Sequence, residues 1–175
     1  GFRNRDKFEY YPAEPLERAK RFPDLNVGVI LDDFSLQAFA PEWNQIELAR
    51  NWNGQLDNLD LVFIESAWNG NHGKWQYQLT GENGVKDDFK SLLSDCRNQG
   101  IPTVFWNKED PPHFEDFIEA ASLFDYVFTS DSRLIPEYTK RLGHERVSAL
   151  MFAAQPSIHN PVRAVGERIA DGVAF

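Results

Sequence analysis

The chain of 175 residues carries 18 lysines and arginines against 27 aspartates and glutamates, a formal net charge of −9. This excess of carboxylates argues against a nucleic-acid-binding protein, because affinity for phosphate backbones comes largely from cationic side chains. Hydrophobic residues make up 42% and charged residues 26%, which is typical of one globular domain and unlike a disordered chain. No apolar run approaches the roughly 20 residues of a membrane span, and the single cysteine, Cys96, fits a reducing, cytoplasmic compartment.

Short β-branched runs that end at polar residues predict the strands of a parallel sheet. In chain order they cover residues 25–31, a weaker segment around Ile46, 61–64, 103–106, 126–129 and 147–151. Between the later runs, apolar residues recur at helical spacing and predict three helices. The first carries Cys96 on its apolar face and ends at Gly100, the second begins with Asp110 as N-cap before Pro111 at N1, and the third is capped within 130–132 and ends at Gly143.

This alternation of strands and helices is typical of βαβ units whose sheet is covered on both faces. We therefore predict an α/β fold, a Rossmann-like three-layer α/β/α domain with a mostly parallel sheet, over residues 25–171. Residues 1–24 are charged and punctuated by prolines, and we expect them to form an N-terminal extension. Residues 172–175 resemble the opening of a strand, so we expect them to start a second domain of a longer protein.

Ligands of open parallel sheets bind outside the carboxyl ends of the strands. The residues that the sequence places at those ends are mostly acidic, hydroxyl or amide: 32–33, 65–66, 107–110, 129–131 and 153–155. Such a rim suits a polyhydroxylated or cationic ligand better than a bare phosphate, because carboxylates repel anions and accept hydrogen bonds from hydroxyls. A sugar is the simplest candidate, and aromatic side chains would offer faces for its ring.

Glu65 and the segment 106–114 carry the strongest functional hypotheses at this rim. Glu65 follows four apolar strand residues, where a loop carboxylate is unexpected, so a function is favoured over surface placement. The segment 106–114 starts in a strand and ends at a helix, which directs its polar side chains to the ligand edge. His113 in this segment fits an acid–base role or a first-turn helix position equally well. Asp110 and Asp131 fit helix caps as well as functional groups.

Several standard sites are excluded by inspection. The sequence contains no Gly-x-Gly, no Gly-x-Ser-x-Gly and no His-Glu-x-x-His, so dinucleotide sites, Walker loops, serine-hydrolase elbows and zinc-protease helices lose support. Asp-x-Asp is also absent, and the four histidines have no ligand-like spacing. We therefore expect no metal site and no cofactor in this domain.

Four segments resemble the N-terminal half of CgeB-like (spore maturation protein-like) bacterial glycosyltransferases. They are residues 65–68, 100–114, 124–131 and 152–156 with 159–161, and the run Trp-Asn-Lys-Glu-Asp-Pro-Pro-His-Phe at 106–114 is the most specific. The resemblance implies a GT-B architecture, in which two Rossmann-like domains face each other across a cleft and a nucleotide-activated sugar is the donor. It also implies metal-independent transfer, an acceptor glycan on this domain, donor nucleotide mainly on a missing C-terminal domain, and a role in cell-surface or spore glycan synthesis.

Glycosyl transfer needs a group that assists loss of the acceptor's proton, and a carboxylate or histidine typically supplies it. Our catalytic candidates are Glu65, His113 and Asp33. The substrate-binding candidates comprise hydroxyl-binding groups, aromatic walls, a lysine that faces the donor diphosphate, and further rim residues: Asn107, Glu109, Asp110, Trp68, Trp106, Lys108, Ser130, Asp131 and Gln155. A retaining enzyme would need no protein base, and the sequence leaves that question open.

Two other function classes stay open. One is a non-catalytic Rossmann-like module whose acidic edge binds a glycan or a protein. The other is a receiver-like signalling domain, because Asp32 and Asp33 follow the first strand, although the phosphoacceptor aspartate and the lysine of such a pocket are missing at the expected strand ends. A longer protein with a nucleotide-binding second domain would favour the transferase.

Overall fold

The computed structural model of this protein describes residues 19–81 and 84–159. Six strands form one all-parallel sheet in the order β2-β1-β3-β4-β5-β6. The strands are β1 (Phe22–Ile30), β2 (Trp43–Glu47), β3 (Leu61–Glu65), β4 (Thr103–Asn107), β5 (Tyr126–Thr129) and β6 (Val147–Ala149). The helices are α1 (Asp33–Phe39), α2 (Asp87–Asn98), α3 (Phe114–Ala121), the 3₁₀ turn η1 (Ser132–Leu134) and α4 (Ile135–Leu142). The prediction of a Rossmann-like α/β fold is confirmed.

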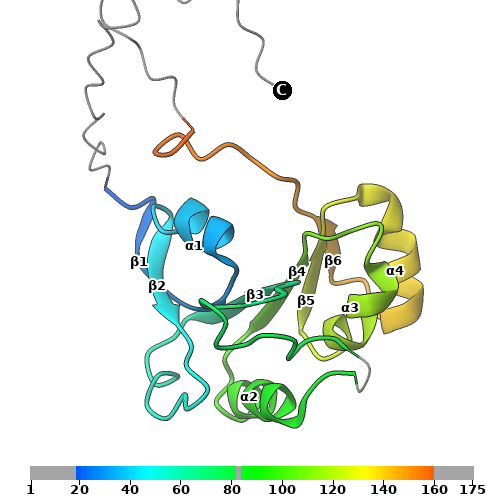
Figure 1. Ribbon diagram of the computed structural model, residues 1–175, viewed down its shortest axis with the longest axis horizontal. Helices are drawn as coiled ribbons and strands as arrows, with labels where there is room; N and C mark the ends of the chain where they lie inside the picture. Colours follow the sequence, from blue (N-terminus) through cyan, green and yellow to red (C-terminus); the bar gives the residue numbers. More distant parts are fainter. Residues whose placement is uncertain (1–18, 82–83, 160–175) are drawn as a thin grey trace, which may run out of the picture. The chain divides into compact units, whose positions relative to one another are not determined.

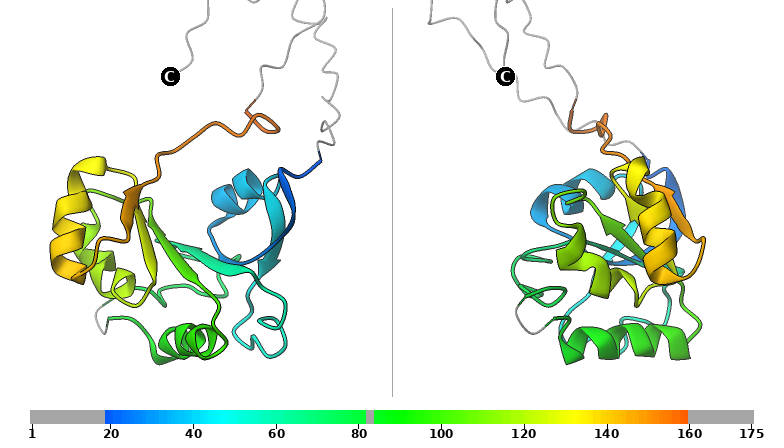
Figure 2. Two further views of the ribbon diagram at one scale, coloured as in Figure 1. Left: turned by 180° about the vertical axis from the view of Figure 1, so that it is seen from behind. Right: turned by 90° about the vertical axis from the view of Figure 1, so that its right-hand side faces the viewer.

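Helices cover both faces of the sheet, unequally (Figure 1). Helix α1 packs on the face that carries Val27, Val29, Phe63 and Trp106. Helices α2, α3 and α4 pack on the opposite face, where they enclose the larger apolar core with Phe105. Figure 2 shows α1 and α2 on opposite sides of the strands. Because both faces are buried, the central strands read as continuous apolar runs rather than as alternating ones.

The strand order reverses direction between β1 and β3. From β1 the chain crosses through α1 to β2 at one edge, whereas β3 to β6 follow one another toward the other edge. The connections on the two sides lie on opposite faces, so the loops that follow β1 and β3 diverge there. Such a reversal leaves a crevice at the carboxyl ends of the two strands, which is where open α/β sheets bind ligands.

The helix ends follow the sequence signals closely, with one exception. Gly100 and Gly143 adopt φ values of +70° and +73° just beyond α2 and at the end of α4, the left-handed conformation that glycine adopts without strain. Cys96 lies on the apolar face of α2 and is fully buried in the core, as its spacing predicts. The exception is α3, which starts at Phe114 rather than directly after Asp110, with His113 as its N-cap residue.

The domain limits differ in part from those predicted. Contacts divide the chain into one unit of Ala19–Ala153 and another of Gly1–Arg18 with Ala154–Phe175, of which 154–159 are described. Strand β1 begins at Phe22, and the Arg21 N–H donates to the Pro41 carbonyl, so the expected extension over 1–24 reaches too far. Residues 1–18 and the expected second-domain start at 172–175 lie outside the described residues. None of the helices described is long and apolar enough to cross a membrane.

Candidate functional site

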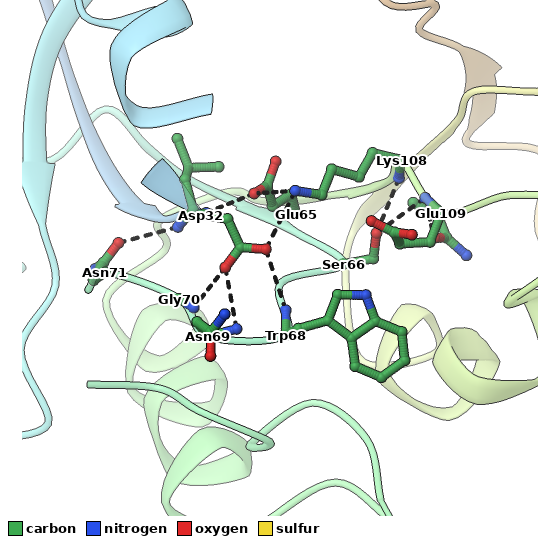
Figure 3. A network of polar contacts seen from close by, with 11 residues as sticks. Asp32, Glu65, Ser66, Trp68, Asn69, Gly70, Asn71, Lys108 and Glu109 are labelled. Carbon is green, nitrogen blue, oxygen red and sulfur yellow. Dashed lines mark hydrogen bonds and ion pairs between the residues drawn. The ribbon is translucent and has the colours of Figure 1, made fainter. Parts of the chain in front are cut away.

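The switch point between β1 and β3 holds a buried cluster of charged groups (Figure 3). Asp32 lies two residues after the end of β1, Glu65 is the last residue of β3, and Lys108 directly follows β4. The Lys108 Nζ lies 2.9 Å from Glu65 Oε1 and 3.2 Å from Asp32 Oδ2. The carboxylates at the ends of β1 and β3 thus meet the ammonium that follows β4. The sequence predicts this convergence of polar side chains at the carboxyl edge of the sheet.

Glu65 is enclosed completely, with a side-chain exposure of 0% against 11% for Lys108 and 19% for Asp32. Its Oε1 also accepts the Asp32 N–H at 2.6 Å, whereas Oε2 and the neighbouring Ser35 hydroxyl are buried without a hydrogen bond to a described residue. Burial raises the pKa of Glu65, and the Lys108 ammonium offsets only part of that effect. Glu65 is therefore out of reach of a substrate, and Lys108 stands between it and solvent.

The other two charges are stabilised in their ionised forms. Burial acts to raise the pKa of Asp32, but the Gly70 amide and the Lys108 ammonium outweigh it and lower the pKa overall. Burial acts to lower the pKa of Lys108, but the carboxylates of Glu65 and Asp32 outweigh it and raise the pKa. The Lys108 ammonium therefore stays protonated, and the carboxylates of Glu65 and Asp32 balance its charge.

Asp32 also fixes the loop that follows β3. Its carboxylate accepts three successive main-chain N–H groups, those of Trp68 at 3.3 Å, Asn69 at 3.1 Å and Gly70 at 2.8 Å. Gly70 has a φ of +53° and no room for a Cβ atom, since Ile30 and Trp75 would stand 2.9 Å from it. One side chain thus sets the position of this loop relative to Lys108.

Two further buried side chains attach the same loop to the sheet. Asn71 is fully buried, accepts the Leu31 N–H at 3.0 Å and donates to the carbonyls of Val29 and Leu48. The indole N–H of Trp75, also fully buried, donates to Leu48 O at 2.8 Å. These bonds make the loop after β3 a fixed part of the domain.

A hydroxyl fixes the segment after β4 in the same way. The Ser66 Oγ accepts the N–H groups of Lys108 at 3.0 Å and Glu109 at 3.3 Å. The Glu109 N–H also donates to Asn107 Oδ1 at 3.1 Å. These bonds fix the main chain of Glu109, a half-buried residue whose carboxylate makes no ion pair or hydrogen bond with any residue that the structure describes.

An aromatic residue and a histidine lie on the loops beside the cluster. The half-buried Trp68 ring meets the His113 ring edge to face, with centroids 5.2 Å apart. The His113 main chain donates to the Glu109 carbonyl at 3.2 Å. His113 Nδ1 lies 2.7 Å from Asp116 Oδ2, so an ionised Asp116 favours the tautomer with its proton on Nδ1. In this tautomer Nε2, which has no partner among the described residues, is a proton acceptor.

Behind the opening lies a second polar network, around Asp110. The Asp110 carboxylate accepts hydrogen bonds from Thr129 Oγ1 at 2.5 Å, Tyr138 Oη at 2.9 Å and Asn107 Nδ2 at 2.9 Å. Asn107 Nδ2 also donates to the Tyr138 hydroxyl. Burial raises the pKa of Asp110, although the bonds from Thr129 and Tyr138 oppose the shift. Asp110 thus ties the segment after β4 to β5 and α4, which corrects its assignment as a helix cap.

Several predicted site residues lie elsewhere. Asp33 points away from the cluster, is 70% exposed and pairs with His72 at 2.8 Å. Trp106 was expected to form a wall of the site, but its ring is buried under α1 and its N–H donates to Leu150 O at 2.9 Å. Asn107 is fully buried and occupied by Asp110 and Tyr138, so it does not face a ligand.

The remaining rim candidates have structural partners. The Ser130 hydroxyl donates to the Lys108 and Asp110 carbonyls, both at 3.3 Å. Asp131 caps η1 by accepting the Arg133 N–H, and the hydrogen bonds from the Arg133 guanidinium, together with that N–H, lower the pKa of Asp131 to about 2. Gln155 belongs to the described stretch 154–159 of the other unit, where its N–H donates to His159 Nδ1.

Sequence reasoning missed four residues of this arrangement. It placed Asp32 at the edge but chose Asp33 for catalysis, and it gave no role to Asn71, Tyr138 in the Asp110 network or Asp116. The position of Asp116 three residues after His113, on the first turn of a helix, is a signal that could have been used. Nothing in the local pattern around Asn71 marks it as buried.

In the described part of the chain, no group of three or more histidine, cysteine, aspartate or glutamate side chains is arranged to hold a metal ion. Two surface hollows are present away from the cluster, one lined by residues 21–25 with Asp60 and one by residues including Arg97, Tyr126 and Arg146. Both hollows lie toward the amino ends of the strands, away from the edge where open α/β sheets bind ligands. The candidate site is therefore defined by the charged cluster at the carboxyl ends.

Comparisons with protein-family models, curated proteins and solved structures give no match to this chain. The resemblance of its motifs to the CgeB-like glycosyltransferases therefore stays a prediction, and the geometry of the site has to carry any proposal.

Proposed function

We propose that this chain is the acceptor-binding domain of a glycosyltransferase that uses a nucleotide-activated sugar. The observation that carries the proposal is the buried triad of Asp32, Glu65 and Lys108 at the β1/β3 switch point, with Trp68, Glu109 and His113 on the loops that follow β3 and β4 beside it. Hydrogen-bond acceptors, an aromatic ring and a carboxylate-oriented histidine at one opening suit a polyhydroxylated ligand. The motif resemblance supports the same class and assigns the donor nucleotide to a second domain.

In this proposal His113 takes the proton of the attacking hydroxyl. A general base needs an unprotonated atom within hydrogen-bond reach of the acceptor, and His113 offers Nε2 while Asp116 holds the ring through Nδ1. Glu65 cannot serve as the base because it is buried behind Lys108. Glu65 instead holds the Lys108 ammonium in place, and this ammonium and Glu109 orient the hydroxyls of the acceptor. The proposal includes a role in cell-surface or spore glycan synthesis, in which the acceptor is a glycan.

The decisive experiment is a transfer assay on the intact protein that contains this chain, with nucleotide sugars and an acceptor glycan library. His113→Ala and Asp116→Asn should lower turnover, by at least tenfold for His113, which is about 1.4 kcal/mol in the barrier. The matched control is His144→Ala, which changes a histidine of the turn after α4 at the opposite edge of the sheet. Equal turnover of the His113 and His144 variants would remove the proposed base.

Binding without transfer would favour the non-catalytic module. Saccharides that shift the amide signals of Trp68, Lys108 and Glu109, in an intact protein that transfers no sugar from any nucleotide donor, would retain the ligand and reject the reaction. No saccharide binding and no transfer would reject both.

A further inference from the structure

The charges around Lys108 determine which acceptors this opening can take. The ammonium is the natural group to attract an anion, but it already contacts two carboxylates at 2.9 and 3.2 Å. With Asp32 and Glu65 ionised, the triad carries a net charge of −1, and with Glu65 protonated it is neutral. In neither state does the triad present a positive charge to a ligand.

Glu109 adds a negative charge beside the triad that nothing described compensates. Its main chain is held by Ser66 and Asn107 through bonds of 3.3 and 3.1 Å, while its half-buried carboxylate has no ion pair among the described residues. Other carboxylates near this edge are matched: Asp131 pairs with Arg133 at 2.6 Å and Asp33 with His72 at 2.8 Å. Glu109 is thus the carboxylate of the opening that is left for a ligand.

The aromatic side of the opening points to the same kind of ligand. The Trp68 ring packs edge to face against the rings of His113 and Phe117, each with centroids 5.2 Å apart, and the His113 main-chain N–H donates to the Glu109 main-chain carbonyl. Figure 3 shows Trp68 and Glu109 to either side of Ser66. An indole face attracts cations through its quadrupole, and a carboxylate nearby adds a direct ion pair. A carboxylate and an indole together recognise an ammonium group.

We propose that the acceptor is an amino sugar, and that Glu109 is the residue that selects it by pairing with its ammonium group. The inference rests on the proposed function, since it describes the acceptor of the same site. Neutral sugars bind through their hydroxyls with less affinity, and sugars that carry a carboxylate or phosphate are rejected, because they would face Glu109 and a triad without net positive charge.

The test compares three glycosides of equal ring geometry: methyl glucoside, methyl 2-amino-2-deoxyglucoside and methyl glucuronide. Binding to the intact protein is measured by calorimetry at about pH 6.5, where an amine with a pKa of about 7.7 is mostly protonated. We expect the amino glycoside to bind at least tenfold more tightly than the glucuronide, about 1.4 kcal/mol. This preference should weaken with added salt, because the opening is partly exposed.

Two variants assign the preference. Glu109→Gln should bring the ratio of amino glycoside to glucuronide affinity close to one. Glu145→Gln makes the same change of charge at an exposed position just before β6, at the other edge of the sheet, and should leave the ratio unchanged. Equal affinities for the three glycosides, tighter binding of the glucuronide, or a preference that survives Glu109→Gln would overturn the inference while the proposed function stands. If neither these three glycosides nor any other saccharide bound to the intact protein, the proposed function itself would be rejected.

Discussion

Removal of the Lys108 ammonium tests whether Lys108 compensates the buried charge of Glu65. In Lys108→Met the apolar stem is kept, but the Glu65 carboxylate, which has no solvent exposure, loses the cation 2.9 Å away. Breaking a buried ion pair by deleting one partner typically costs about 3–5 kcal/mol, since the remaining charge is left buried. We expect a loss of this size in the free energy of unfolding at about pH 8.

The loss should depend on pH in a defined direction. Burial raises the pKa of Glu65 above its ordinary value, and without Lys108 that pKa rises further. The folded state of the variant then binds more protons than the unfolded state, whose glutamate titrates near about 4.3, so stability falls as pH rises through this window. The variant should therefore recover part of its stability toward about pH 5, by up to about 1.4 kcal/mol per pH unit.

Urea unfolding at the two pH values provides the measurement. The control is Lys90→Met, which removes a surface ion pair with Glu119 whose side chains are 45% and 52% exposed, and should cost less than about 1 kcal/mol at either pH. The double variant Glu65→Gln with Lys108→Met should regain most of the loss, because the fully enclosed carboxylate is gone and Asp32 keeps its three main-chain N–H donors. A Lys108→Met penalty that matches Lys90→Met, or that is the same at both pH values, would refute the compensated pair.

The loop after β3 gives two more predictions. Gly70→Ala should cost about 2–4 kcal/mol in thermal unfolding, because φ is +53° and its Cβ would stand 2.9 Å from Ile30 and Trp75, whereas Gly73→Ala, at φ +86° with open space, should cost about 1 kcal/mol. Asp32→Ala should cost about 2–3 kcal/mol at neutral pH and less below about pH 4, because its lowered pKa gives stability that is lost as the carboxylate protonates. Acetate should restore part of that loss by occupying the three amides, and an Asp32→Ala variant that unfolds like the wild type would contradict this role.

The fold could be predicted because its signals are local. The central strands contain short apolar runs, β2 gives only a weak signal around Ile46, and α2 and α4 are followed by glycines that adopt positive φ. Helix α1 was not predicted, since its seven residues give only two turns and too few apolar positions to show a period. The start of α3 was misplaced because Asp110 resembles an N-cap in sequence, whereas Thr129 and Tyr138, both distant in the chain, occupy its carboxylate.

The sequence predicted that the site lies at the carboxyl edge of the sheet, but not which side chains meet there. The sequence indicates that Glu65 and Lys108 end neighbouring strands, but two adjacent aspartates follow β1, and only the backbone geometry decides that Asp32 turns inward and Asp33 outward. Trp106 is a similar case. A strand covered on both faces has no polar side, so the pattern cannot show that its ring packs under α1 rather than lining the opening.

The triad itself is better explained by chemistry than by stability. Replacing a buried ion pair with apolar side chains of similar volume is often neutral or stabilising, so the fold does not need charges at positions 65 and 108. Exposed pairs such as Arg141 with Glu115 contribute little and are tolerated anywhere on a surface. A fully buried carboxylate held against a lysine at the switch point is different, because it keeps an ammonium protonated and fixed where a ligand of this sheet would lie. This argument would fail if Glu65→Leu with Lys108→Met retained saccharide binding, since the charges would then serve no ligand.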